Sequence, residues 1–298
     1  MIFGKNRVPL PLLYCATVGF AIESANTVGF YQKTLNNVFK VRAAQFDSTS
    51  DTSFMVSDAV QCDSPVAVSC WADRDNWEYN DGWDETAPQI QVQNASGVFE
   101  PFFYVSDARV YDEEGNESFV EGWADNSGML ANANEIPCGS GIWLRGYKNG
   151  TETVADTGFT FAGQVMTDAS GDIAGENMFK VRAMPYPVDQ ALNSTKCVWT
   201  ALTPVSCWSD RDNWEYNDGW DETAPQIQVL NASGVFEPFF YVTDARVYDE
   251  EGNESFVTGW ADNSGMLARE DEGNGIVKIG DGVWFNARKA NVSCTISK

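Results

Sequence analysis

The stretch that decides the fold is VSCWADRDNWEYNDGWDETAPQIQVQNASGVFEPFFYVSDARVYDEEGNESFVEGWADNSGMLA, residues 68–131, because it occurs twice in the chain. The second copy is residues 205–268, shifted by 137 positions. The copies differ only at Ala72/Ser209, Gln93/Leu230, Ser106/Thr243 and Glu121/Thr258. An internal repeat fixes the architecture before any other pattern does. Copies this similar also fit a recent duplication, so their identity does not single out functional residues.

The flanks of the repeat have diverged, and they indicate how far the repeated unit extends. Matching segments are residues 39–43 with 179–183, residues 141–143 with 282–284 and, more weakly, residues 27–30 with 156–159. The spacing between matches changes along the chain, as insertions in surface loops would cause. A unit of about 130 residues is a typical domain size. We therefore expect one domain at 22–150 and a second at 151–298.

Composition narrows the possible functions. The 298 residues are 43% hydrophobic, which is enough for packed cores, and they include no histidine. The commonest general base and metal ligand is therefore missing. The formal net charge of −24 argues against nucleic acid as a partner, because binding there depends on neutralising phosphates with Lys and Arg. No phosphate-binding loop or nucleophile motif is present, so we do not expect an enzyme.

Residues 1–21 have the layout of a secretory signal peptide. Lys5 and Arg7 precede a mostly apolar run, and small residues lead up to a cleavage site predicted after Ala21. The run is too short to span a bilayer, and no other segment is long and apolar enough, so we expect no membrane span. The sequence predicts a secreted protein, extracellular or at the cell surface. The alternative is a buried N-terminal strand that is never cleaved.

The cysteines fit an oxidising compartment. Removal of Cys15 with the signal leaves six, an even number that favours disulfides. The simplest pairing is local, Cys62 with Cys70 and Cys197 with Cys207. Cys138 and Cys294 then remain to bridge the two domains, or two chains.

The pattern along each copy is one of short strands separated by turns. The predicted hairpins are residues 29–35 with 38–46, residues 89–93 with 98–105, and residues 108–111 with 118–120, and residues 141–147 form a closing strand. Alternation of apolar and polar residues marks several of them, as in Phe39, Val41 and Ala43. Pro101 suggests a sheet edge or a bulge. The chain is predicted to be all-β, with two tandem, near-identical β-sandwich or small-barrel domains.

Both ends of each predicted domain resemble a known pattern. The segment ESANTVGF at residues 23–30 is similar to the mature N-terminus, of the SANTVGY type, of a family of uncharacterised secreted bacterial β-proteins. The segments GSGIW at 139–143 and GDGVW at 280–284 resemble that family's closing strand, of the GxG(F/I/V)W type. The Trp-rich loop is not part of the pattern. The resemblance implies secretion and a β fold, and it implies no catalytic activity.

The Trp-rich acidic loop is the main candidate site, and three interpretations of it compete. The carboxylates could bind Ca²⁺, the only cofactor that the residues suggest, although the spacing is not that of an EF-hand. The tryptophans could stack on sugars, or they could pack structurally while the acids face water. The sugar candidates are Trp71, Trp77, Trp83, Trp208, Trp214 and Trp220, and the Ca²⁺ candidates are Asp73, Asp75, Asp81, Asp84, Asp210, Asp212, Asp218 and Asp221.

The sequence also contains acceptor motifs for N-linked glycans. The candidate positions are Asn94, Asn116, Asn149, Asn193, Asn231, Asn253 and Asn291. Several fall on predicted turns, where a glycan would be exposed. The alternative is that these asparagines are unmodified polar turn residues.

Two functions follow from these observations. The first is an extracellular structural protein, the subunit of a self-assembling filament or surface layer that polymerises head to tail. In that hypothesis the segment at 23–35 adds a strand to the next subunit's sheet, and the segment at 154–165 makes the same connection within the chain. The alternative is a carbohydrate-binding or adhesive module that uses the Trp-rich loops and has glycans as partners.

Overall fold

The structure is a computed structural model. It describes residues 28–35, 39–47, 53–55, 60–62, 68–73, 78–79, 86–94, 98–131, 135–137, 139–147, 157–165, 170–199, 201–210, 215–216 and 220–297. The predicted signal at 1–21 lies outside these residues. The fold is all-β, as the sequence predicted, and its sheets are antiparallel.

Among the described residues, thirteen strands lie between residues 28 and 165, and we call them the first unit. They are β1 (Val28–Leu35), β2 (Lys40–Ala43), β3 (Phe46–Asp47), β4 (Ser53–Met55), β5 (Val60–Cys62), β6 (Trp71–Asp73), β7 (Glu78–Tyr79), β8 (Gln89–Gln93), β9 (Phe99–Tyr111), β10 (Glu117–Ala124), β11 (Glu135–Pro137), β12 (Gly141–Arg145) and β13 (Thr157–Val165).

The remaining strands form the second unit. They are β14 (Ser170–Gly175), β15 (Lys180–Ala183), β16 (Gln190–Ala191), β17 (Cys197–Val198), β18 (Trp208–Asp210), β19 (Glu215–Tyr216), β20 (Gln226–Leu230), β21 (Phe236–Tyr248), β22 (Glu254–Ala261), β23 (Ile276–Val277), β24 (Gly282–Asn286) and β25 (Val292–Ser297). Short helical segments are α3 (Trp220–Thr223) and the 3-10 turn η1 (Glu270–Glu272).

Each unit contains a five-stranded sheet with the same strand order. In the first unit the order is β10-β9-β8-β12-β2, and in the second it is β22-β21-β20-β24-β15. The period-2 pattern explains the strands: Ile90 and Val92 of β8 are buried, whereas Gln91 and Gln93 are only half-buried. The hairpins β8–β9 and β9–β10 confirm two of the predicted turns.

A second, smaller sheet covers each five-stranded sheet and completes a sandwich-like layer. In the first unit β13 pairs with β1, β3 and β5, and in the second β25 pairs with β14 and β17. The core lies between the two layers. Trp123 of β10 stacks on Phe159 of β13, with ring centroids 6.3 Å apart. Its counterpart Trp260 lies in the core of the second unit together with Ile296 of β25.

The pairing of β13 moves the division between the units away from residue 150. A boundary at 150/151 would separate β13 from all three of its partners. By position in the sheets, β13 is the counterpart of β25, and β1 is the counterpart of β14. Residues 27–30 resemble residues 156–159 in sequence, but the two segments belong to β1 and β13, which pair with each other. They therefore do not occupy equivalent places in the two units. The division falls between Val165 and Ser170.

Two local predictions were wrong or incomplete. The predicted hairpin of residues 29–35 with 38–46 does not form, because β1 belongs to the small sheet and β2 to the five-stranded sheet. The segments 98–105 and 108–111 form one strand, β9, of 13 residues. Pro101 lies in the part of β9 that pairs with β8 but not with β10, so its missing N–H interrupts no ladder there.

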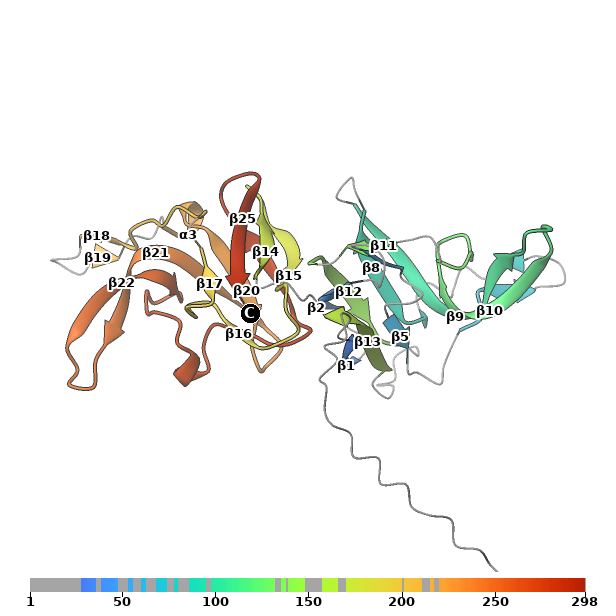
Figure 1. The fold of residues 1–298 in the computed structure, drawn as a ribbon, viewed down its shortest axis with the longest axis horizontal. Coiled ribbons are helices and arrows are strands. Elements are labelled where there is room, and N and C mark those ends of the chain that lie inside the picture. Colours follow the sequence, from blue (N-terminus) through green and yellow to red (C-terminus); the bar gives the residue numbers. More distant parts are fainter. Residues whose placement is uncertain are drawn as a thin grey trace, which may run out of the picture.

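The two units lie side by side along the long axis of the molecule (Figure 1). The long hairpins β9–β10 and β21–β22 extend toward opposite ends, and β12, β2 and β15 lie near the middle. No helix among the described residues is long and apolar enough to cross a membrane.

Candidate functional site

The first tryptophan of each Trp-rich loop has a structural role. Trp71 is only 9% exposed and packs in a core cluster with Cys70 and Phe103. The guanidinium of Arg109 covers its ring at 4.3 Å from the centroid. Trp208 is half-buried, and Arg246 covers it in the same way at 4.6 Å. The arginine occupies one face of each ring, and the sugar-binding role of Trp71 and Trp208 stays a prediction.

The remaining loop candidates fall into two groups. Trp77, Trp83, Trp214, Asp75, Asp81, Asp84, Asp212 and Asp218 lie outside the described residues. Asp73, Asp210, Trp220 and Asp221 are placed in β6, β18 and α3 by their backbone alone. Within the described part of the chain, no three carboxylate or cysteine groups come together as a metal site. Calcium binding by these loops stays a prediction.

The predicted local disulfides are not formed by the cysteines that the structure describes. Cys70, Cys197, Cys207 and Cys294 are all buried free thiols, and Cys62 and Cys138 have no described side chain. Cys207 donates to the Asp244 carbonyl oxygen at 3.5 Å in one cluster, whereas Cys197 donates to the Ala191 carbonyl oxygen at 3.3 Å in another. The two thiols lie in separate cores, and the pairing Cys197–Cys207 is not formed in the structure.

The sequon asparagines occupy different environments. Asn193 is part-buried, and its amide donates to the carbonyls of Trp260 and Ala268 while its oxygen accepts from the Trp260 N–H. A glycan there would displace these bonds. Asn94, Asn116, Asn231 and Asn253 each donate to a nearby carboxylate in a turn, and Asn291 is exposed between β24 and β25. Asn149 lies outside the described residues.

The two units meet through the same face of each. The Ala43 N–H donates to the Gly280 carbonyl at 3.1 Å, and the Ala183 N–H donates to the Gly139 carbonyl at 2.9 Å. Ala43 and Ala183 are equivalent residues in the repeated FKVRA segment, and Gly139 and Gly280 are equivalent in the closing motif. The contact is therefore reciprocal, as in an isologous dimer.

Small residues allow this close approach. A Cβ at Gly141 would collide with Val181, and a Cβ at the equivalent Gly282 would lie 2.5 Å from Val41 Cγ1 and 2.6 Å from the Arg42 carbonyl oxygen. Any larger side chain at either glycine would push the units apart. The glycines of the closing motif thus have a packing role at the junction.

The isologous junction removes the basis of the head-to-tail prediction. That prediction assumed that the two units meet through different faces, each of which stays available on a neighbouring chain. Here the same face of both units is used, and such a contact closes on itself. The other part of that hypothesis fits the structure, because residues 157–165 form β13, which pairs within the chain with β1, β3 and β5.

One buried side chain of the first unit, that of Gln45, forms hydrogen bonds to the second unit across the junction. Gln45 is 1% exposed; its amide nitrogen donates to the carbonyls of Met184 at 3.1 Å and Tyr186 at 2.8 Å. Its oxygen accepts from the Gly280 N–H at 2.8 Å. The side-chain amide is therefore fully used in contacts with the second unit. Pro185 stands at the equivalent place in the repeat, so this connection has no counterpart.

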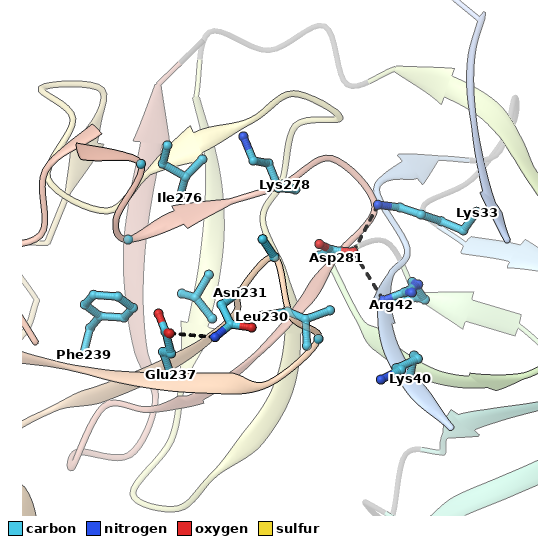
Figure 2. A pocket seen from close by; sticks show the side chains of 15 residues that line it. Lys33, Lys40, Arg42, Leu230, Asn231, Glu237, Phe239, Ile276, Lys278 and Asp281 are labelled. Atoms are coloured by element: carbon cyan, nitrogen blue, oxygen red, sulfur yellow. Dashed lines mark hydrogen bonds and ion pairs between the residues drawn. The ribbon is translucent and has the colours of Figure 1, made fainter. Parts of the chain in front are cut away.

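A group of charged residues also lies at the junction (Figure 2). Asp281 Oδ1 accepts from Lys33 Nζ at 3.1 Å and from Arg42 Nη1 at 3.3 Å, and the Asp281 side chain is only 12% exposed. Lys278 binds Asp189 at 2.9 Å. Partial burial acts to raise the pKa of Asp189, but hydrogen bonds from Lys278 and the Ile279 N–H outweigh it and lower that pKa, with a smaller contribution from Lys33.

Sequence reasoning did not identify these junction residues. Gln45 and Lys33 lie in diverged flanks, and their partners are more than 130 positions away. The one available signal was that the flanks of the repeat differ in sequence between the two copies, whereas the repeat itself is nearly identical. Comparison of the chain with protein-family models, with curated proteins and with solved structures gives no match.

Proposed function

We propose that the protein is a non-enzymatic, extracellular structural protein that assembles through its two outer ends. The observation that carries the proposal is the isologous junction, which directs equivalent surfaces of the two units away from each other (Figure 1). The extracellular location rests on the signal peptide predicted at residues 1–21. In this proposal each molecule contacts two neighbouring molecules through two equivalent ends.

The outer hairpins carry the apolar surface that such contacts need. Tyr111 and Val120 on β9 and β10 are 49% and 39% exposed, and their equivalents Tyr248 and Val257 are 41% and 38% exposed. Exposed large apolar residues favour an interaction surface, and the duplication places the same residues on both hairpins. Each end therefore offers the same pair of exposed apolar residues, one on each face of its hairpin, and we call this pair the hairpin patch.

Assembly through the hairpin patch would produce a linear array. The junction is already used within the chain, whereas the two outer ends face away from it (Figure 1). A contact of one end with the same end of another molecule is itself isologous, and alternation of two such contacts extends a filament. The formal charge of −24 opposes association, so salt or Ca²⁺ should promote it by screening.

Sedimentation and negative-stain microscopy of the secreted protein test the proposal. We expect linear oligomers, whose length grows with concentration and with physiological salt. A variant with Tyr111→Lys and Val120→Lys alters one end only, and it should stop at dimers joined through the unaltered ends. A variant altered at both ends, with Tyr248→Lys and Val257→Lys added, should be monomeric.

A matched control comes from an exposed apolar residue away from the hairpins. Val188 is 54% exposed, and Val188→Lys should leave the oligomer distribution unchanged. A wild-type protein that remains monomeric at every concentration, with and without Ca²⁺, would overturn the proposed function. Equal oligomers in the one-end and both-end variants would place the contact elsewhere.

A further inference from the structure

A cavity of about 410 Å³ lies at the junction, with walls from both units. Lys33, Lys40 and Arg42 of β1 and β2 form one wall, and the β20–β21 turn and the segment around residues 273–281 form the other (Figure 2). This volume falls in the range of small-molecule sites, roughly 300–1,000 Å³. The cavity belongs to neither the Trp-rich loop nor the hairpin patch.

The cavity gathers positive charge in a strongly acidic protein. Four cationic side chains line it, against the two carboxylates of Asp281 and Glu237, although the chain as a whole has a formal charge of −24. Asp281 is already shared by Lys33 and Arg42, and Lys278 binds Asp189. Glu237 accepts from Asn231 at 2.6 Å. The cationic side chains that line the cavity therefore outnumber the carboxylates that could neutralise them.

Lys40 is the cation with no protein partner. Its side chain is half-buried and forms no ion pair or hydrogen bond with any residue that the structure describes. Its Nζ lies across the junction beside Gly234, 3.3 Å from where a Cβ at that glycine would stand. The ammonium group thus lies at the cavity wall and is available to an anionic ligand.

The equivalent place on the other side of the junction does not carry the same charges. Lys180 and Arg182 repeat Lys40 and Arg42, but Ile173 replaces Lys33 and Ser140 replaces Asp281. Arg182 donates to the Val181 carbonyl at 3.2 Å, as Arg42 does to the Val41 carbonyl, and it donates to the Ala174 carbonyl at 2.9 Å. The cationic cavity is therefore a property of one side, built by residues that diverged after the duplication.

We propose that this cavity binds a small polyanion, a molecule with phosphate or several carboxylate groups, and that Lys40 is the residue whose ammonium group contacts it. Lysine ammonium groups bind such oxygens through charge-assisted hydrogen bonds, which are the stronger class. Because both units contribute to the cavity, the bound anion bridges them. A ligand that binds only the assembled junction stabilises the folded chain.

Titration calorimetry and thermal unfolding test this, with inorganic phosphate and citrate as probes at constant ionic strength. We expect saturable binding of at least one probe and a rise in melting temperature that chloride does not reproduce. Lys40→Gln should weaken binding by about tenfold, the loss of one charge-assisted contact. Lys180→Gln is the matched control, because Lys180 is the equivalent lysine on the other side, and it should leave binding unchanged.

The two probes distinguish the class of ligand that the cavity binds. Binding of phosphate alone assigns a ligand with one compact acidic group, and binding of citrate alone assigns an extended polycarboxylate. Saturable binding by neither probe overturns the proposal, and so does an equal loss in Lys40→Gln and Lys180→Gln, which would indicate non-specific attraction. The melting temperature of each variant without ligand shows whether the fold is intact. Failure here leaves the end-to-end assembly untouched, because the hairpin patch lies elsewhere.

Discussion

The indole rings of Trp143 and Trp284 contact each other across the junction, with centroids 5.6 Å apart and planes at 68°. The two residues are equivalent in the repeat, each being the tryptophan of the closing motif. A residue that meets its own counterpart must lie close to the two-fold axis of an isologous contact. The pair therefore marks the pseudo-two-fold axis that relates the two units.

The Trp143–Trp284 pair should contribute measurable coupling energy. Trp143→Ala and Trp284→Ala should each lower the free energy of unfolding, and the double variant should lose less than the sum. We expect a coupling of about 0.5–1.5 kcal/mol, typical of an edge-to-face aromatic pair. Urea unfolding followed by circular dichroism measures it. Trp123→Phe and Trp260→Phe form the control cycle and should be additive, because these rings lie in separate cores.

Replacement of Gln45 should weaken the junction. Gln45→Leu leaves the Met184 and Tyr186 carbonyls and the Gly280 N–H without their partner in a buried place. Unpaired buried groups of this kind cost about 1–3 kcal/mol. Denaturant unfolding checks the loss, and the exposed Gln32 offers a control: Gln32→Ala should change stability by less than about 0.5 kcal/mol. Similar losses in both variants would contradict the fastening role of Gln45.

The buried cysteines should react only after unfolding. Desolvation raises the pKa of Cys197 to about 11 and that of Cys294 to about 12, the latter with a contribution from Asp172, so neither forms a thiolate at neutral pH. Cys70 and Cys207 are fully buried. We expect a thiol reagent to find these four groups in unfolded, unreduced protein and none of them in native protein. Recovery of fewer than four thiols after unfolding would show that one of the four is oxidised.

Asp112 should titrate below the ordinary aspartate range. Hydrogen bonds from the Asn116 side-chain amide and backbone N–H lower its pKa, and Asp249 has the same partners on Asn253. A lowered folded-state pKa contributes stability above the unfolded pKa, and this is lost as the pH falls through the folded pKa. Asn116→Ala should raise the pKa of Asp112 and leave that of Asp249 unchanged. Carboxyl titration by NMR reads both, and an unshifted Asp112 in the variant would refute the assignment.

The sequence was sufficient for the fold class and for the local hairpins. Alternation in residues 89–93 and the turn at 112–116 predict β8, β9 and β10 because neighbouring strands in a hairpin are also neighbours in sequence. It was insufficient for β1 and β2, where a short connection leads from one layer to the other. A turn signal such as Asn36-Asn37 does not reveal whether the next strand pairs or crosses to the opposite sheet.

The junction and the cationic cavity were beyond sequence reasoning for a different reason. Their contacts join residues far apart in the chain, as Lys33 and Asp281 do. No periodic pattern in the sequence indicates which face of a sheet packs against the equivalent face of the other unit. The Trp-rich loop attracted attention by composition, yet Trp71 proved to be a buried core residue.

The position of β13 at the end of the first unit has a consequence for how the chain is made. Strands β8 and β20 read QIQVQ and QIQVL, so after complete denaturation each can pair with the partners of the other. Near-identical neighbours in one chain are prone to such misassembly during refolding. Synthesis from the N-terminus avoids the competition, because β13 closes the first sandwich before β20 leaves the ribosome. We expect refolding from denaturant to recover less native protein than biosynthesis does, with the lost fraction as strand-exchanged species.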